Sequence, residues 1–255
     1  MNRKLRVALT GASGKMGQES ARAISDQPDL QLVGAVSRSR AGDDLGAVIG
    51  RGPVGLTLAP TLSALFETTG ADVVVDFTRS EAARENIAVA LSHGARPVVG
   101  TTGLSPVELD GLDRRCRNLG LGCVVCPNFS VGAMLLGRFA REAAAYLPDV
   151  EIIELHHQAK VDAPSGTALR LKATVDEALG ASLRRPTPIH SVRLPGLVAH
   201  HRVVFGGPGE VLTLSHDSLS RQSFMPGLIT AVRAVMTFIG LVTDLAVLLE
   251  MGKRP

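Results

Sequence analysis

The sequence predicts an α/β fold: a parallel, doubly wound sheet in the first half and a smaller α+β domain in the second. Three observations support this prediction. Short valine-rich runs alternate with helical patterns up to about residue 127, which is typical of parallel strands joined by helices. A glycine-rich turn follows the first of these runs. Beyond residue 127, two long helical patterns are followed by strand-like segments with a hairpin signal.

The first half contains five predicted strands, each a short apolar run of the kind that forms a buried strand. They cover residues 5–10, 30–36, 71–77, 95–99 and 121–126. Helical patterns lie between them, over residues 15–25, 61–67, 80–93 and 105–119. This alternation predicts one open sheet with connecting helices.

The second half begins with a helical pattern over residues 130–146 and a strand-like segment over 151–157. Another helix is predicted over residues 165–179, where a glycine closes it. From residue 189 onward the pattern indicates strands, with a hairpin turn at 206–209.

Residues 227–251 are predicted to form two further helices. We therefore expect a dinucleotide-binding domain over residues 1–127 and a second domain over 128–227. The sequence leaves open whether the C-terminal helices (about 228–255) return to the first domain.

Composition excludes several classes of protein. The 255 residues include 27 Lys or Arg and 24 Asp or Glu, a net charge of +3 without a basic run, so no nucleic-acid partner is expected. Three cysteines are too few for a disulfide framework and fit a reducing compartment. The chain opens without a signal-peptide pattern, and its apolar run over 234–243 is shorter than the roughly twenty residues of a bilayer span. We expect a soluble, cytoplasmic protein without a membrane partner.

The glycine-rich turn after the first strand is the first functional motif. Gly11, Gly14 and Gly17 form a GxxGxxG pattern between a strand and a helix. The first glycine permits a tight turn, the second lets backbone N–H groups approach a pyrophosphate, and the third allows close helix–strand packing. Phosphates would lie at the helix N-terminus. An ordinary strand–turn–helix joint is the alternative, but the place of the motif in an α/β pattern favours nucleotide binding.

The end of the second strand bears on which nicotinamide cofactor is bound. A dinucleotide fold usually carries an acidic residue there, which binds the ribose 2′-hydroxyl. Here Ser37, Arg38, Ser39 and Arg40 follow the strand instead, and guanidinium groups are suited to a 2′-phosphate. We expect NADPH to bind at least as well as NADH, with a solvated turn as the alternative interpretation.

A second cluster of reactive side chains follows the strand predicted over residues 151–157. His156, His157 and Lys160 lie within five residues of one another, and Ser165 opens a helix whose first N–H groups form an anion site. This combination could hold an acidic substrate while a histidine or the lysine transfers a proton. Histidines that simply end a strand are the alternative.

A metal site is the rival interpretation of this cluster, because a second histidine pair occurs at His200 and His201. Neighbouring residues of a strand face opposite ways, so each pair can offer only one ligand to a site. No Cys/His spacing completes a ligand set. No metal is therefore expected.

These residues carry a resemblance that extends over almost the whole chain. The segment EIIELHHQAKVDAPSGTA, residues 151–168, resembles the signature of the 4-hydroxy-tetrahydrodipicolinate reductase (dihydrodipicolinate reductase) family of lysine and diaminopimelate synthesis. Other segments resemble the family in the same order and spacing: GASGKMG, DFT, GTTG, PNFSVG, HSVRLPGLVAHHRVVFGG and HDSLSRQSFMPG.

The resemblance implies a Rossmann-like first domain and a second domain, built on a mixed open sheet, that binds the substrate and assembles a homotetramer. The reaction it implies is NAD(P)H-dependent reduction of 4-hydroxy-tetrahydrodipicolinate, a small dicarboxylate, to tetrahydrodipicolinate. In such an enzyme His156 is the proton donor and acceptor, and Lys160 is a proton donor.

The resemblance also implies the binding residues. Those around the substrate are His157, Lys160, Ser165, Gly166, Thr167 and Arg221. Those along the cofactor are Gly11, Ala12, Ser13, Gly14, Lys15, Met16, Gly100, Thr101, Thr102, Cys126, Pro127, Asn128 and Phe129. Ser37, followed by Arg38, replaces the acidic residue that the family places on the adenosine ribose, which argues against a strong preference for NADH.

Three other functions are weighed against this one. An aldehyde-type dehydrogenase, such as a semialdehyde dehydrogenase, would share the glycine turn and need Cys126 as its nucleophile, although a buried strand-end cysteine is the simpler interpretation. A non-catalytic NADP(H) sensor would not need His156, His157, Lys160 and Arg221 together. A metal-dependent hydrolase lacks ligands.

Overall fold

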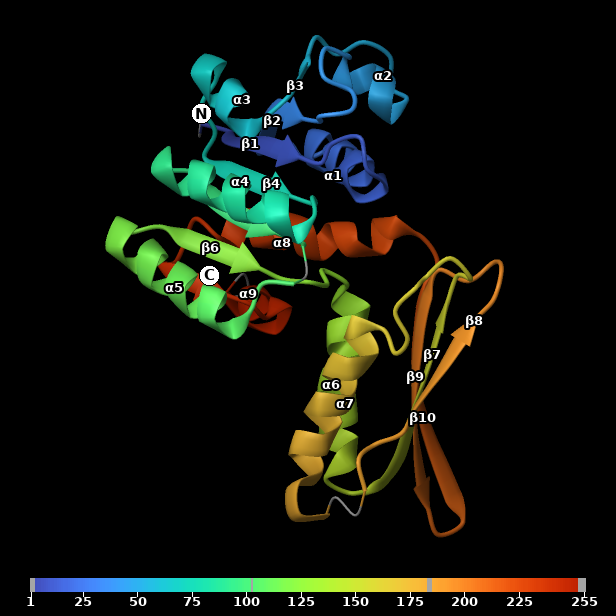
Figure 1. The fold of residues 1–255 in the computed structure, drawn as a ribbon. Helices are drawn as coiled ribbons and strands as arrows, with labels where there is room; N and C mark the ends of the chain where they lie inside the picture. The colour runs from blue at the N-terminus through green and yellow to red at the C-terminus, as the bar shows by residue number, and fades with distance from the viewer. Residues whose placement is uncertain (1–2, 102, 183–184, 252–255) are drawn as a thin grey trace. The chain divides into compact units, whose positions relative to one another are not determined.

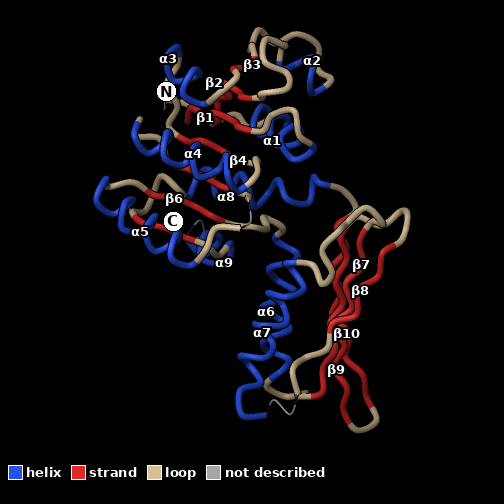
Figure 2. The backbone as a smooth tube through the Cα atoms, in the orientation of Figure 1, coloured by secondary structure: helices blue, strands red, loops and turns tan. Residues whose placement is uncertain are grey.

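The computed structural model describes residues 3–101, 103–182 and 185–251. Thr102, one of the predicted cofactor residues, lies outside the described residues. The chain divides into two compact units, which are unit 1 (residues 1–129 and 224–255) and unit 2 (residues 130–223). Each unit combines a sheet with helices (Figures 1 and 2).

Unit 1, as far as it is described, is built on a seven-stranded parallel sheet in the order β11-β6-β5-β4-β1-β2-β3. Its strands are β1 (Leu5–Thr10), β2 (Leu30–Val36), β3 (Leu58–Ala59), β4 (Val73–Asp76), β5 (Arg96–Val99), β6 (Gly122–Val125) and β11 (Gly240–Val242). From β1 the chain winds to β2 and β3 on one side and then to β4, β5 and β6 on the other. A reversal of this kind creates a crevice at the carboxyl ends of the strands, where dinucleotides bind.

Helices of unit 1 pack on this sheet in two sets (Figure 1). One set is α1 (Lys15–Ser25), α8 (Met225–Ala234) and α9 (Leu245–Met251), in which α8 contacts both others. The other is α3 (Leu62–Thr68), α4 (Ser80–Ser92) and α5 (Pro106–Leu119), and the short helix α2 (Leu45–Ile49) contacts α1. Local sequence explains where α5 begins, because Ser105 and Glu108 form a capping box and Pro106 between them is the first helical residue. Among the described helices, none has the length and hydrophobicity needed to cross a membrane.

Helices α8 and α9 confirm the two helices predicted over residues 227–251, but the segment between them also contains a strand that was not predicted. Residues Gly240–Val242 form strand β11, which pairs in parallel with β6. Gly240 has a φ of +100°, which a right-handed helix does not contain. A short apolar run is compatible with a helix or a strand, and here pairing with β6 decides. Two further elements, α2 and β3, are not anticipated by the sequence pattern.

Unit 2 contains a four-stranded mixed sheet in the order β10-β9-β7-β8 within its described residues. Strand β7 (Asp149–His156) runs parallel to β8 (Ile189–Arg193) and antiparallel to β9 (Ala199–Gly207), and β9 forms a hairpin with β10 (Glu210–Ser218). The remaining elements are α6 (Val131–Ala144), α7 (Gly166–Leu179), η1 (Gly180–Ser182) and η2 (Arg221–Phe224). The parallel sheet of unit 1 and this mixed sheet confirm the predicted fold class.

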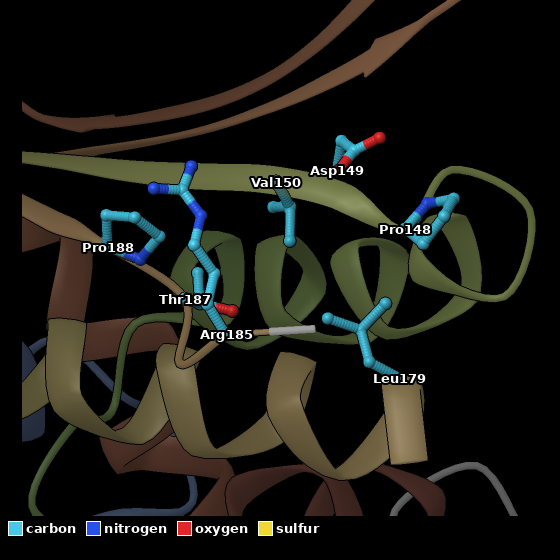
Figure 3. Close-up of a pocket in the computed structure, with 7 residues that line it drawn as sticks. All are labelled: Pro148, Asp149, Val150, Leu179, Arg185, Thr187 and Pro188. Carbon is cyan, nitrogen blue, oxygen red and sulfur yellow. The ribbon is translucent and has the colours of Figure 1, made fainter. Parts of the chain in front are cut away.

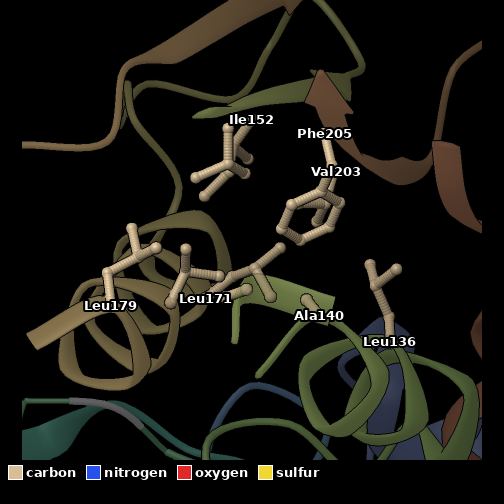
Figure 4. Close-up of a cluster of buried hydrophobic side chains, with 10 residues drawn as sticks. Leu136, Ala140, Ile152, Leu171, Leu179, Val203 and Phe205 are labelled. Atoms are coloured by element: carbon tan, nitrogen blue, oxygen red, sulfur yellow. The ribbon is translucent and has the colours of Figure 1, made fainter. Parts of the chain in front are cut away.

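One face of the sheet of unit 2 packs on α6 and α7 to form a core (Figure 4). Buried residues alternate along β7, as expected when one strand face is covered: Val150, Ile152, Glu154 and His156. The first two belong to the apolar core, whereas the last two are polar. The buried face of β7 therefore changes from apolar to polar toward the carboxyl end of the strand.

Candidate active site

The loops that carry the predicted cofactor residues leave the carboxyl ends of parallel strands in unit 1. Gly11 follows β1, Ser37 follows β2, Gly100 follows β5 and Cys126 follows β6. Carboxyl ends of parallel strands share one edge of a sheet, so the fold brings these loops to the edge where α/β proteins bind nucleotides.

The glycine turn has the geometry that the motif predicts. Gly11 has a φ of +75°, and a Cβ on it would lie 2.8 Å from the carbonyl oxygen of Phe77. Gly17 is buried against the same turn, and a Cβ there would lie 2.1 Å from the carbonyl oxygen of Gly11. Gly14 is the exposed N-cap of α1, and no side chain of the described residues caps that helix. This open helix N-terminus fits the pyrophosphate of a dinucleotide.

The other residues predicted along the cofactor flank this turn or follow β6. The backbone N–H of Ala12 donates to the carbonyl oxygen of Val36, at the end of β2, and Lys15 and Met16 begin α1. Pro127 and Asn128 are partly buried, and Phe129 packs edge-on against Phe77 with ring centroids 6.0 Å apart.

A buried carboxylate to which the sequence motifs assign no role connects the carboxyl ends of three neighbouring strands. Asp76, 1% exposed, ends β4 and accepts hydrogen bonds from Thr10 Oγ1 at 2.6 Å, Thr78 Oγ1 at 2.7 Å, Asn86 Nδ2 at 2.7 Å and Thr101 Oγ1 at 3.3 Å. These partners come from the end of β1, the loop after β4, helix α4 and the loop after β5. An acidic residue at the end of an otherwise apolar strand is the signal that could have identified it.

The region expected to contact the adenosine ribose is partly occupied by an internal ion pair. Ser37 is buried, and its Oγ lies 2.7 Å from Ser13 Oγ in the glycine turn. Arg40 Nε donates to Asp43 Oδ2 at 2.6 Å. Arg38 is exposed and makes no hydrogen bond or ion pair with any described residue. Of the two arginines that follow β2, Arg38 is therefore the one left to meet a 2′-phosphate.

Cys126 does not have the surroundings of a nucleophile. It is 1% exposed, and its thiol donates to the carbonyl oxygen of Asn128 at 3.1 Å. A reactive cysteine needs an accessible, electropositive environment that lowers its pKa. The structure thus disfavours the aldehyde-dehydrogenase alternative, which depends on this residue.

The polar end of β7 in unit 2 holds a histidine–carboxylate pair. His156 is 6% exposed, and its Nδ1 hydrogen-bonds to Oε2 of Glu154, which is fully buried. Arg193 on the neighbouring strand β8 binds both oxygens of that carboxylate, through Nη2 at 2.7 Å and Nη1 at 3.0 Å. The register of β7 and β8 explains this arrangement, because it aligns Ser191 with Glu154 and Arg193 with His156.

The environment sets the charge of each partner. Burial alone would raise the pKa of the Glu154 carboxyl, but hydrogen bonds from Arg193, Ser191 and His156 outweigh it and lower that pKa to about 2. Burial lowers the pKa of His156, against the opposing effect of Glu154. At neutral pH, Glu154 is therefore ionised and His156 is neutral. Because the ionised carboxylate only accepts hydrogen bonds, the Nδ1–H of His156 donates, and Nε2 carries the lone pair.

A second histidine completes the cluster. His201 on β9 aligns with Glu154, and its ring packs edge-on against that of His156 with centroids 5.4 Å apart. Its Nε2 lies 3.4 Å from Ser165 Oγ, whereas its Nδ1 is buried and has no partner among the described residues. His200, the next residue back along β9, pairs instead with Asp217. In the part of the chain that is described, no group of three His, Cys, Asp or Glu side chains is arranged to hold a metal ion.

We expect the histidine cluster to make unit 2 sensitive to mild acid. Burial, reinforced by repulsion from His156 once that ring is protonated, lowers the pKa of His201 from 6.5 to about 4. The unfolded chain therefore binds a proton between pH 6.5 and 4 that the folded chain does not, so the free energy of unfolding falls as the pH drops through this window. For His201 alone the loss between pH 7 and pH 5 is about 2 kcal/mol.

Urea unfolding at pH 7 and pH 5 measures this loss. A His201→Gln variant should show a smaller difference between the two pH values than the parent protein, and His190→Gln, which removes a half-exposed histidine on β8, is the control. Equal pH dependence in the parent protein and the His201→Gln variant would contradict the assignment.

The remaining predicted substrate residues lie in the segment after β7. Lys160 Nζ donates to Asp162 Oδ1 at 2.7 Å, and the Lys160 N–H donates to the carbonyl oxygen of His157 at 3.0 Å. Ser165 is the N-cap of α7 and accepts from the backbone N–H of Ala168 at 3.2 Å. The first turn of α7 follows with Gly166, which is exposed, and Thr167, which is partly buried.

Arg221 is the predicted substrate residue that the structure leaves apart. It begins η2, is partly exposed and makes no hydrogen bond or ion pair within the described residues. By contrast, His201 directly links the ring of His156 to the hydroxyl of Ser165. Unit 2 therefore brings His156 and Ser165 together, and no contact in the described residues adds Arg221 to them.

A small pocket in unit 2 lies away from these residues (Figure 3). It is lined by Pro148, Asp149, Val150, Leu179, Arg185, Thr187 and Pro188. Asp149 and Val150 begin β7, whereas His156 ends it. His156 lies seven residue steps beyond Asp149 along the strand, a distance of about 23 Å. None of the predicted site residues lines this pocket.

The sequence motifs assign no role in this cluster to three of its residues: Glu154, Arg193 and His201, of which His201 was considered only as a metal ligand. Glu154 was detectable, because it shares the period-2 face of β7 with His156 and interrupts apolar positions. Arg193 and His201 come from other strands, and only the sheet register shows that they meet Glu154.

Comparison with known proteins agrees with this geometry. Residues 5–129 match the family model described as dihydrodipicolinate reductase, N-terminus, and residues 132–248 match dihydrodipicolinate reductase, C-terminus. A 4-hydroxy-tetrahydrodipicolinate reductase of Moorella thermoacetica is 43% identical over 96% of this chain and 98% of its own length. The 4-hydroxy-tetrahydrodipicolinate reductase of Symbiobacterium thermophilum is 47% identical over 91% of this chain and 92% of its own length.

Solved structures give the same result. A dipicolinate-bound dihydrodipicolinate reductase from Paenisporosarcina sp. TG-14 superimposes with a TM-score of 0.80, at 37% identity over 95% of this chain and 98% of that one. An amine dehydrogenase from Mycobacterium smegmatis, 17% identical with a TM-score of 0.68, shares the fold. Both halves of the sequence and the fold thus point to one family, and the chain belongs to the dihydrodipicolinate reductases.

Proposed function

We propose that the protein is a 4-hydroxy-tetrahydrodipicolinate reductase of lysine and diaminopimelate synthesis, which reduces its substrate to tetrahydrodipicolinate with NAD(P)H. The observation that carries this proposal is the buried Glu154–His156 pair, which His201 links to the N-cap of α7, in a chain whose two halves both match the family. This pair supplies a proton-transfer group close to an anion-binding helix end.

Unit 1 supplies the proposed cofactor-binding residues. The open N-terminus of α1 is suited to the pyrophosphate, and the buried Asp76 holds together the loops after β1, β4 and β5 that flank it. A bound nicotinamide supplies hydride. The role of unit 1 is therefore to bind and orient the dinucleotide.

Unit 2 supplies the proposed substrate-binding residues. The first turn of α7 and the Lys160 ammonium are suited to bind the two carboxylates of the substrate, and we assign Arg221 to the same set. Loss of the 4-hydroxyl group as water would give a conjugated ring, and hydride addition to that ring would push electron density toward the ring nitrogen. His156 Nε2 and Lys160 Nζ are the groups that can hold or deliver the proton this nitrogen requires.

Cofactor choice is proposed to favour NADPH at least as much as NADH, because Arg38 is free for a 2′-phosphate and no carboxylate occupies that place. Replacing Arg38 with glutamate should weaken NADPH binding by about tenfold or more, since it removes a charge-assisted hydrogen bond. NADH binding should change by less than twofold. Arg40→Glu is the control, because the Arg40 guanidinium is already engaged by Asp43.

The dissociation constants are measured by titrating the fluorescence of each reduced cofactor in parallel. An equal loss of NADPH and NADH affinity in the Arg38→Glu variant would refute the assignment of this residue to the 2′-phosphate.

Two further properties belong to the same proposal. The family relationship supports a cytoplasmic enzyme. We also propose that unit 2, with its four-stranded sheet, forms the homotetramer interface that the resemblance implies.

A coupled assay tests the function directly. The substrate is generated in the cuvette from pyruvate and aspartate semialdehyde by its synthase, and the nicotinamide absorbance is followed with NADPH or NADH. Oxidation that requires both the synthase and this protein is the expected result. Oxidation with semialdehyde in the absence of synthase would support the dehydrogenase alternative. Tight NADPH binding without turnover would support the sensor.

A further inference from the structure

A buried ion pair in unit 2 has no role in the proposal so far. Glu154 is fully buried, and the side chain of Arg193 is 18% exposed. Val150 and Ile152 precede Glu154 on the same strand face and belong to the apolar core. An apolar residue at position 154 would continue that core, and a buried ion pair is seldom more stabilising than well-packed apolar side chains. Stability alone therefore does not explain why a charge lies here.

The hydrogen bonds of Glu154 hold its carboxylate in one orientation. Arg193 binds both oxygens in a bidentate arrangement, and Ser191 donates to the same carboxylate. Both partners lie on β8, so they are part of a regular sheet. The remaining hydrogen bond of Oε2 goes to Nδ1 of His156. The imidazole thus meets a carboxylate that cannot rotate away from it.

The same guanidinium also reaches the segment that carries Lys160. Arg193 Nη2 donates to the backbone carbonyl oxygen of Asp162 at 2.7 Å. The carboxylate of Asp162 in turn binds Lys160 Nζ at 2.7 Å. One side chain on β8 is therefore connected, through one intermediate residue in each case, to both groups assigned to proton transfer.

We infer that Glu154 and Arg193 are positioning residues that hold His156 in its Nδ1–H tautomer, with Nε2 as the nitrogen that exchanges a proton with the substrate. This inference rests on the proposed function only in assigning the proton transfer to His156. The charged or titratable groups around the imidazole are Glu154 on its own strand, Arg193 on β8, His201 on β9 and Lys160 in the loop. Of these, Glu154 accepts the hydrogen bond from Nδ1.

The tautomer of His156 is the direct test, and it does not depend on activity. In protein labelled with ¹⁵N-histidine, the ring nitrogen shifts distinguish Nδ1–H from Nε2–H. A His156→Gln variant identifies which signals belong to His156. The expected result in the parent protein is Nδ1–H at neutral pH. Isolated imidazole side chains favour Nε2–H, so finding that form at His156 would overturn the inference without any further variant.

Glu154→Gln tests the consequence for catalysis. The amide keeps the shape of the side chain but removes the charge that binds Arg193 and selects the tautomer. We expect a mixed tautomer and a fall in kcat of about 10–100-fold, as for other residues that orient a reactive group. KM for the substrate and Kd for NADPH should stay within about twofold. A kcat within twofold of the parent value, whatever the tautomer, would overturn the positioning role.

The chain offers a matched control on the same strand. Glu151 also binds one arginine and one histidine, through Arg185 Nη2 at 2.9 Å and His190 Nε2 at 2.8 Å, but it is partly exposed. Glu151→Gln should leave the His156 tautomer and kcat unchanged. An equal loss of kcat in both variants would show that any carboxylate removed from β7 has this effect, and would overturn the inference.

Arg193→Lys replaces Glu154→Gln if that variant does not fold, as judged by circular dichroism. A lysine keeps the positive charge but cannot bind the carboxylate bidentately and reach the carbonyl oxygen of Asp162 at once. A loss of kcat without a change in NADPH Kd is again expected, and unchanged kcat would overturn the inference. Failure of the function itself is recognised separately, because the parent protein would then be inactive while its His156 tautomer could still be read.

Discussion

Replacing Lys160 with alanine is expected to abolish most turnover while leaving NADPH binding intact. The Lys160 ammonium is proposed both to deliver a proton and to bind a substrate carboxylate, and loss of a positioned acid typically costs about 10²–10⁴-fold in rate. The side chain lies in unit 2, paired with Asp162, whereas the glycine turn that is proposed to bind the dinucleotide lies in unit 1. The measurement is kcat and KM in the coupled assay, together with the Kd for NADPH.

Lys172 provides the control for this variant. It is also a lysine of unit 2 paired with an aspartate, Asp176, and its side chain is 24% exposed against 23% for Lys160. Lys172→Ala should retain parent activity. Turnover of Lys160→Ala within a few-fold of the parent value would show that the role assigned to Lys160 is wrong.

Gly17→Ala is expected to damage the dinucleotide site through packing alone. The added Cβ would lie 2.1 Å from the carbonyl oxygen of Gly11 and 2.9 Å from Ala12 Cα, so the turn must move. Overpacking of this kind lowers stability by about 1–3 kcal/mol. Movement of the turn should weaken NADPH binding by about tenfold, the equivalent of ~1.4 kcal/mol. Thermal unfolding with and without NADPH measures both effects.

Gly137→Ala is the matched control, since it also replaces a glycine inside a helix. A Cβ at Gly137 would meet only Leu171 Cδ1, at 3.9 Å. Without a clash, the higher helix propensity of alanine should raise stability by up to about 1 kcal/mol. The two substitutions are therefore expected to shift the melting temperature in opposite directions. If Gly17→Ala melted at or above the parent temperature with unchanged NADPH affinity, the packing argument for the third glycine would fail.

Strong local signals account for what could be predicted about the fold. Helix α1 occupies the predicted residues, Lys15–Ser25, because a glycine turn precedes it and a regular apolar spacing runs through it. The valine-rich strands of unit 1 were recognisable because both faces of a parallel sheet are buried. β11 was not, because three residues of an apolar run become a strand only when β6 lies beside them.

The candidate site likewise contains residues that local sequence identifies and residues that only the fold brings together. His156, Lys160 and Ser165 lie close together in the sequence, so their motif could be identified directly. Asp76 and Glu154 could be suspected as acidic residues in apolar strands, but their partners could not be named. Thr101 is 25 positions from Asp76, and Arg193 is 39 from Glu154.

The sequence by itself therefore determined the α/β class, the glycine turn and the cluster that carries His156 and Lys160, because residues adjacent along the chain specify each of them. Only the tertiary structure decided that Asp76 meets Thr101 from the loop after β5. It also decided that Arg193 and His201 surround the Glu154–His156 pair. The physical reason is that strand register, which follows from the burial of whole sheet faces, selects these neighbours.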